Sequence, residues 1–198
     1  MSVVTVAEVK ALGRITNDSQ DVLIQTLIDS AESFVEAFCD VSLTSAEVSE
    51  NLDGGGYYLY PSRKPVTAVT TIFESGVELA SEDYAFECFG IYQATELPWT
   101  AGKQIFATTY TGGYAEAPAG LKLAIKQMAL RAYMNFEAKT SSSESERDTS
   151  WQDLWNGNDI TALLEQFSHK AILACEDKDE SVIQSIRRGW VLNANSLL

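Results

Sequence analysis

The sequence predicts an α+β fold, mainly helical: a small helix bundle with an inserted antiparallel β-sheet of short strands, followed by a helical C-terminal extension. Apolar residues recur at three- and four-residue steps near both ends of the chain, which is the period of an amphipathic helix. Short β-rich segments separated by turn residues fill the middle, as is typical of a small antiparallel sheet. Residues 140–150 contain no apolar side chain and separate this unit, residues 1–139, from residues 151–198.

Two helices are predicted within residues 5–38. Thr5 and Glu8 have the T-x-x-E spacing of a capping box, which begins the first helix. Asn17 or Asp18 can cap a longer second helix, because both side chains accept hydrogen bonds from unpaired backbone amides. The apolar face of that second helix consists of Val22, Leu23, Leu27, Ala31, Phe34, Val35 and Phe38.

Residues 43–114 are predicted to form the sheet. The glycines at 54–56 make a turn, and Pro61 and Pro65 interrupt regular strand pairing because proline cannot donate to a ladder. The Asp53–Gly56 turn lacks the G-K-[ST] ending of a phosphate-binding loop and leads into a strand. The segments predicted as strands are 57–60, 66–73, 77–79, 84–89, 91–92 and 103–110.

A third helix is predicted over residues 118–139. Pro118 suits the first helical position, where its missing amide hydrogen costs nothing. One apolar face follows, made of Leu121, Ala124, Ile125, Met128, Ala129, Ala132 and Phe136. Beyond the polar linker 140–150, another apolar stripe predicts a helix in the extension, with Ile160, Leu163, Leu164, Phe167, Ala171 and Cys175 on it.

The charge of the chain argues against nucleic-acid binding as its main activity. Lys and Arg total 14 against 28 Asp and Glu, which gives a formal net charge of −14. Binding to phosphates needs cations, whereas an acidic surface repels DNA and would let it slide past. The N-terminus lacks the basic start and apolar stretch of a signal peptide, and no run of 18 apolar residues could span a membrane. We therefore expect synthesis in the cytoplasm and no membrane partner.

The residues that usually carry chemistry are sparse. His169 is the only histidine, and Cys39, Cys88 and Cys175 lie far apart, so neither a multi-histidine metal site nor a C-x-x-C pair can form. A Ser-His-Asp arrangement built on one histidine on the polar side of a predicted helix is improbable. We predict no catalytic residue, no metal ligand and no cofactor, and hence a protein that is not an enzyme.

Three stretches in this order resemble the head-tail connector (adaptor) family of tailed bacteriophages. Residues 15–39 read ITNDSQDVLIQTLIDSAESFVEAFC, residues 57–72 read YYLYPSRKPVTAVTTI, and residues 108–135 read TTYTGGYAEAPAGLKLAIKQMALRAYMN. They are similar to the family's acidic loop and helix, its entry into the sheet, and its strand-to-helix junction. The resemblance covers about residues 3–139. Phe167 is not followed by the arginine that the family pattern has, and residues 168–198 continue beyond the family's usual end.

The resemblance implies a structural virion protein. Subunits would form a homo-oligomeric ring, expected to be a dodecamer, that docks beneath the portal protein and offers a platform to a head-closure or tail neck protein. Genomic DNA would pass through the ring's channel without specific binding, so the ring would prolong the DNA channel. The protein would be made in the host cytoplasm and reside in the neck of the virion. The family has no catalytic residues, so the resemblance implies none in this chain.

Two sets of residues are candidates for partner contacts. The apolar stripe of the extension needs a partner surface, which could be the subunit's own core, a neighbouring subunit or the portal; the resemblance favours the portal for part of this region. The residues predicted to contact the portal are Ile160, Leu163, Leu164, Phe167, Arg187, Arg188 and Trp190. Those predicted for the ring interface are Tyr57, Tyr58, Tyr60, Trp151 and Trp155, with ordinary core packing as the alternative for each.

Two other classes of function remain open on the sequence alone. One is an assembly or binding domain of non-viral origin, and the other is an uncharacterised enzyme with a substrate pocket in the sheet. The connector hypothesis differs from both in requiring a ring, a portal partner and no reaction.

Overall fold

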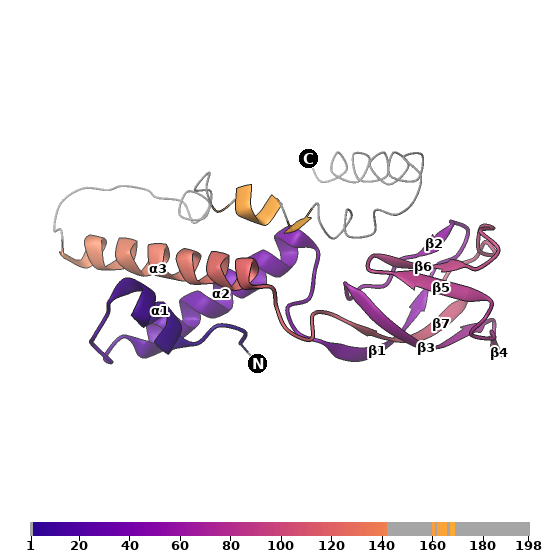
Figure 1. Ribbon diagram of the computed structural model, residues 1–198, viewed down its shortest axis with the longest axis horizontal. Helices are drawn as coiled ribbons and strands as arrows, with labels where there is room; N and C mark the ends of the chain where they lie inside the picture. The colour runs from indigo at the N-terminus through magenta and orange to yellow at the C-terminus, as the bar shows by residue number, and fades with distance from the viewer. Residues whose placement is uncertain (1, 142–159, 161, 166, 169–198) are drawn as a thin grey trace.

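A computed structural model describes residues 2–141, 160, 162–165, 167 and 168, and shows two lobes along one long axis (Figure 1). The helical lobe contains α1 (Val6–Gly13), α2 (Asp21–Cys39) and α3 (Ala119–Ser141), together with the described part of 160–168. The β-lobe is the chain between α2 and α3, from residue 46 to residue 112. Its strands are β1 (Ala46–Leu52), β2 (Tyr58–Leu59), β3 (Val66–Glu74), β4 (Val77–Glu78), β5 (Tyr84–Glu87), β6 (Gly90–Gln93) and β7 (Phe106–Gly112).

The α+β class is confirmed, but the description of the fold as mainly helical is not supported, because strands also make up a large share of it. Within the described residues the chain between α2 and α3 forms seven strands in two sheets, and these make up a whole lobe. Six of the seven strands lie in or overlap segments predicted as strands, whereas β1 was not predicted, because its largely polar sequence AEVSENL shows no clear apolar alternation. Pairing with β7, which no local pattern reveals, stabilises it.

The first helix begins as predicted, whereas the second begins later. The Glu8 amide donates to Thr5 Oγ1 at 3.3 Å and the Thr5 amide donates to Glu8 Oε2 at 2.9 Å, which completes the capping box. Asn17 does not cap α2; its Oδ1 accepts a hydrogen bond from the Ser19 amide at 2.9 Å, within the loop that precedes the helix. α2 therefore starts at Asp21, and it runs to Cys39.

The two sheets are antiparallel throughout. The larger has the strand order β1-β7-β3-β4 and the smaller β2-β6-β5. β7 lies between β1 and β3, and its alternation turns Phe106, Thr108 and Tyr110 into the interior of the lobe. Six buried residues form the β-lobe core: Leu52, Leu59, Ile72, Ile91, Trp99 and Phe106.

A second, larger core lies in the helical lobe. α2 contributes Ile24, Ile28 and Val35 to it, and α3 contributes Leu121 and Ile125, all fully buried. Ile160 and Leu164 belong to the same core, although the polar segment separates them from α3 in sequence. α3 extends to Ser141, so the first two residues of the predicted linker are helical, and residues 142–150 lie outside the described part. The division into residues 1–139, 140–150 and 151–198 stays a prediction.

A search of the described helices finds none with both the length and the apolar character needed to cross a bilayer.

Candidate functional site

The smaller sheet carries a group of aromatic side chains on its outer face. Alternation along β2 turns Leu59 inward, where it is fully buried, and leaves Tyr58 and Tyr60 on the other side. The Tyr58 ring centroid lies 5.0 Å from that of Phe89, 5.7 Å from Tyr92 and 6.2 Å from Tyr60. These separations are typical of favourable aromatic pairs. We call Tyr58, Tyr60, Phe89 and Tyr92 the aromatic face.

Two of the three tyrosines predicted for a ring interface are open to solvent. Tyr57 is 63% exposed and Tyr60 is 57% exposed, whereas Tyr58 is half-buried among the other rings. Burial raises the pKa of Tyr58 to about 12, and the nearby Glu87 carboxylate adds to this shift. Tyr58 is therefore neutral at physiological pH. The aromatic face can contribute contact area and hydroxyl hydrogen bonds to a partner without adding charge.

Arg63 connects the aromatic segment to the joint between the lobes. Its Nε donates to the Gly112 carbonyl at 3.0 Å, and its Nη2 donates to Thr44 Oγ1 at 3.0 Å and also to the Thr44 carbonyl. Gly113 beside it has a φ of +96°, and a Cβ there would lie 2.1 Å from the Thr44 carbonyl oxygen. Only glycine fits this approach. The joint thus brings together residues 44, 63 and 112–113, which are distant in sequence.

A partly buried hydrogen-bond network continues from the joint into the β-lobe. The Tyr110 hydroxyl donates to Glu50 Oε1 at 2.7 Å and accepts a hydrogen bond from the Arg63 amide at 2.9 Å. The Ser62 amide donates to the same Glu50 oxygen at 2.8 Å. Burial raises the pKa of Tyr110 above its ordinary value. The Tyr110 hydroxyl, the Glu50 carboxylate and the amides of Ser62 and Arg63 are thus paired with one another. These hydrogen bonds hold the 60–65 segment in place.

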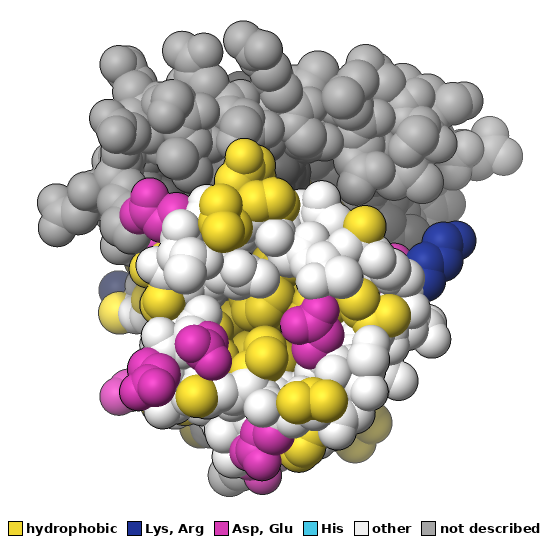
Figure 2. Space-filling view, turned by 90° about the vertical axis from the view of Figure 1, so that its right-hand side faces the viewer, with side chains coloured by type: hydrophobic (Ala, Val, Ile, Leu, Met, Phe, Trp, Pro, Cys, Tyr) yellow, Lys and Arg dark blue, Asp and Glu magenta, His cyan; other side chains and the backbone are white. Residues whose placement is uncertain are grey.

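The far end of the β-lobe is poor in cations. Residues 46–112 contain nine acidic and three basic residues, and two of the basic ones, Arg63 and Lys64, are bound at the joint, where Lys64 pairs with Asp40 at 2.5 Å. Figure 2 shows this end: acidic side chains are distributed among hydrophobic and polar ones, and basic side chains are scarce. Val77 and Leu97, in β4 and in the loop after β6, are 68% and 60% exposed. This end therefore combines apolar surface with negative charge.

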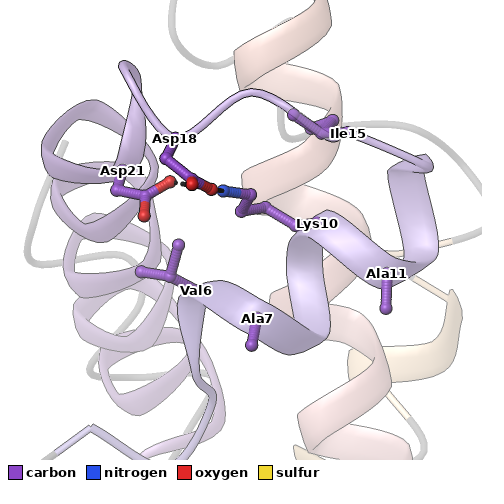
Figure 3. Close-up of a pocket in the computed structure, with 7 residues that line it drawn as sticks. All are labelled: Val6, Ala7, Lys10, Ala11, Ile15, Asp18 and Asp21. Atoms are coloured by element: carbon purple, nitrogen blue, oxygen red, sulfur yellow. Dashed lines mark hydrogen bonds and ion pairs between the residues drawn. The ribbon is translucent and has the colours of Figure 1, made fainter.

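A shallow, open hollow lies between α1 and the start of α2 (Figure 3). Apolar side chains line most of it, and the Lys10 ammonium group reaches across to Asp18 and to Asp21, the latter at 2.8 Å. The hydrogen bond with Asp18 raises the pKa of Lys10, and the same bond lowers that of Asp18. The charged groups are paired with one another, so this arrangement fastens the loop before α2 to α1 and provides no catalytic group.

The predicted portal contacts divide into two groups. Ile160 and Leu164 are buried in the subunit's own helical core, and Leu163 and Phe167 pack beside them. Their contact with a portal would require this segment to leave that core, and it stays a prediction. Arg187, Arg188 and Trp190 lie outside the described residues, as do Trp151 and Trp155 from the ring-interface set and His169.

Gly120 is a packing position that the sequence analysis did not single out. A Cβ on Gly120 would lie 2.4 Å from Phe167 Cζ, so the glycine makes the space in which the ring sits against α3. Cys39 is a free, buried thiol, and its Sγ lies 3.7 Å from the Leu164 carbonyl oxygen. The sequence did offer a signal, because glycine within a predicted helix destabilises that helix. Such a glycine often indicates that another side chain packs closely against the helix at that position.

The described residues include no group of three His, Cys, Asp or Glu side chains that could hold a metal ion. Thr108 Oγ1 is their only buried side-chain oxygen or nitrogen without a hydrogen-bond partner, and it lies on the inner side of β7. The exposed surfaces are therefore the candidates for function.

Comparisons with known proteins agree with this picture. The sequence profile of a family described as head completion protein matches residues 2–148. Among solved structures, the chain is similar to a protein in the virion of a native gene transfer agent (GTA) particle, with a TM-score of 0.54 and 15% identity over 82% of this chain and 87% of that one. A chain from the neck of an empty GTA particle, computed with C6 symmetry, gives a TM-score of 0.49 and 15% identity, covering 80% of this chain and 87% of that one. No curated protein sequence matches the chain.

Proposed function

The chain belongs to the head completion protein family, and from that premise we propose that it is a subunit of a ring between the portal and the neck or tail proteins of a tailed phage or phage-derived particle. The ring prolongs the DNA channel and carries the next neck protein. The observation that carries this proposal is the family match across residues 2–148, which includes both lobes. The subunit acts by binding its neighbours, and no reaction is assigned to it.

Surface composition supports an assembly role. Exposed aromatic side chains such as Tyr57 and Tyr60 are frequent anchors in protein interfaces, because they bury much area at little cost in conformational entropy. We assign them to a contact with a neighbouring subunit or neck protein. The net charge of −14 supports passage of DNA without tight binding, since a basic channel would retain the duplex. We expect no submicromolar binding of duplex DNA at physiological salt.

The portal contact is assigned to the end of the extension. Arg187, Arg188 and Trp190 combine cations with an aromatic ring in an otherwise acidic chain. Ile160 and Leu164 already have a partner in their own subunit, so the residues after 168 are better candidates for reaching another protein. A chain that ends after Ser168 should keep the helical core and lose attachment to purified portal rings in co-sedimentation.

Particles assembled without this protein test the proposed function directly. Deletion should give heads that package DNA but lose it or carry no tail, as seen by negative-stain microscopy and by sensitivity of the packaged DNA to nuclease. Complementation with a Tyr57→Asp, Tyr60→Asp double variant should restore few tailed particles. Leu12→Asp, at a 44% exposed position on α1, is the matched control and should restore them fully. Normal tailed particles after deletion would exclude the proposed role.

A further inference from the structure

Three loops meet at one end of the smaller sheet. β2 and β5 begin at this end and β6 ends there, because β6 is antiparallel to both of its neighbours. The Ala94 amide donates to the Asp83 carbonyl oxygen at 2.9 Å, and the Trp99 amide donates to the Gly56 carbonyl oxygen at 2.8 Å. The segment before β2, the turn before β5 and the loop after β6 are therefore neighbours in space, although they are separate in sequence.

The exposed side chains of these loops are apolar or acidic. Tyr57 is 63% exposed and Leu97 is 60% exposed. Glu82, Asp83 and Glu96 are exposed in the same three loops. We call these five residues the β-lobe tip. Figure 2 views this end of the molecule, where acidic side chains lie among hydrophobic ones, so the surface offers both contact area and negative charge.

The carboxylates of the β-lobe tip have no cation from their own subunit. None of the ion pairs among the described residues includes Glu82, Asp83 or Glu96. Residues 66–102 contain six acidic residues and no basic one. Elsewhere in the described chain, lysines hold carboxylates of the same subunit. The tip is therefore free to attract cations from another molecule.

The loop that carries Glu96 and Leu97 is held in place by Trp99. The Trp99 side chain is buried, and its Nε1 donates to the Ile91 carbonyl oxygen at 3.2 Å. Its ring packs edge-on against Phe106, with 4.9 Å between the ring centroids. A surface that is already fixed loses little conformational entropy on binding, which favours affinity for a partner.

We propose that the β-lobe tip binds a basic segment of the next neck protein, whose Arg or Lys side chains pair with the carboxylates of Glu82, Asp83 and Glu96. An Arg side chain can also stack on the exposed ring of Tyr57, and Leu97 adds apolar contact area. This inference rests on the proposed function, and it names the chemistry of the partner that the β-lobe receives.

Charge argues against the other possible occupants of the tip. A second copy of this chain has a net charge of −14, so it would bring mainly negative charge to an acidic surface. Duplex DNA is a polyanion and would be repelled for the same reason. The described residues contain no group of three side chains that could ligate a metal ion. A basic protein segment has the complementary charge, and its side chains can also use the exposed apolar area.

Charge reversal in the full-length chain tests the contact in solution. The tip variant carries Glu82→Lys and Glu96→Lys; its control carries Asp29→Lys and Glu116→Lys, which change the net charge equally at exposed positions of the helical lobe. The probe is a fluorescein-labelled peptide of alternating Arg and Trp, used at physiological salt. It should bind the tip variant about tenfold more weakly than wild type and bind the control like wild type. Equal weakening in both variants, or no difference between the tip variant and wild type, would overturn the inference.

Complementation of the deletion strain tests the same two variants in particles. Heads made with the tip variant should contain that chain and lack the next neck protein, as mass spectrometry of purified heads would show. Heads made with the control should contain both proteins and acquire tails. Loss of ring formation by the tip variant in native mass spectrometry would assign the tip to a contact between copies and overturn the inference. Tailed particles from the tip variant would overturn this inference alone, whereas tailed particles from the deletion strain itself would overturn the proposed function.

Discussion

The helical lobe draws its core from segments that are far apart in the chain, whereas the β-lobe closes its core within one continuous segment. Among the residues that the structure describes, twenty are buried in the helical core, from Val4 to Leu164. Six make the β-lobe core, all between Leu52 and Phe106. The β-lobe core thus comes from one inserted segment, and the helical core from segments that are far apart in sequence.

This difference indicates that the two lobes can be disturbed separately. Loss of a terminal segment removes part of one core and leaves the other complete. Their main connection is the joint at Arg63, Thr44 and Gly112. Four changes, in order of decreasing effect, should show how far the lobes are independent.

Removal of residues 151–198 should have the largest effect. A chain of residues 1–150 loses Ile160 and Leu164, both fully buried, at a cost of about 1.5–3 kcal/mol each in lost burial. The free energy of unfolding of the helical lobe should fall by about 3–6 kcal/mol relative to a chain of residues 1–168. Trp99, buried in the β-lobe, is the only tryptophan in residues 1–150, so its fluorescence reports that lobe while circular dichroism at 222 nm reports the helices.

Urea titration should therefore show the helical signal shifted in 1–150 and the Trp99 signal nearly unchanged. For comparison, the 1–168 chain should carry Trp151→Phe and Trp155→Phe, so that Trp99 is again the only tryptophan. Coincident shifts of both signals would mean that the lobes unfold as one unit. Equal stability of the two chains would mean that the 160–168 segment does not contribute to the core.

Arg63→Ala should have the next largest effect, because it removes the charged donor at the joint. Three acceptors lose their partner: the carbonyl oxygens of Gly112 and Thr44 and the Thr44 hydroxyl. We expect about 2 kcal/mol of destabilisation, the usual range for hydrogen bonds to a charged group. Lysine keeps the positive charge but lacks the planar guanidinium group with its several donors. Arg63→Lys should therefore restore only part of the lost stability. Hydrogen exchange should increase first at residues 42–44 and 112–114, and a uniform increase over both lobes would contradict a local role.

Gly120→Ala should have a smaller effect whose sign depends on Phe167. In an ordinary helix interior, Gly→Ala stabilises by about 1 kcal/mol. Here the new methyl group would lie 2.4 Å from the Phe167 ring, so the ring must move and the gain should be offset. In a Phe167→Ala background the gain should reappear, at less than the about 1 kcal/mol of a helix interior, because Gly120 lies in the first turn of α3. Thermal melts of the four chains in this double-mutant cycle give the coupling, and additive effects would show that Gly120 does not accommodate the ring.

Acid pH should have the smallest effect, through the Lys10–Asp18 pair. Lys10 lowers the pKa of Asp18 in the folded chain, so the pair stabilises the fold above the ordinary aspartate pKa of about 3.9, and this stability is lost as pH falls through the lower folded value. Asp18→Asn should lower the melting temperature slightly at pH 7. The difference from wild type should shrink as the pH falls below the ordinary aspartate pKa and disappear once Asp18 is protonated in the folded chain. A difference that persists at acid pH would mean that the ion pair is not its cause.

Local sequence signals located the helices and most of the strands, but they did not reveal β1 or the pairing of the strands into two sheets. The Thr5–Glu8 capping box and the long apolar stripe of α2 each depend on residues within one or two turns, so they could be found without tertiary structure. The start of α2 was placed too early because Asn17 and Asp18 have loop partners, the Ser19 amide and Lys10, that compete with capping. Of the proposed assembly surfaces, the tyrosines near 57–60 could be nominated from sequence, but their exposure could not.

The sequence alone determined the helix periods, the turn positions, the acidic character and the absence of a recognisable catalytic motif, because each is a property of neighbouring residues or of composition. Tertiary structure decided which apolar stripes are core and which are surface. Ile160 and Leu164 look no different in sequence from Leu123 and Met134, yet the first pair is buried and the second is exposed. Burial depends on what the rest of the chain places against a side chain, and contacts across more than a hundred residues, such as Cys39 with Leu164, leave no local pattern.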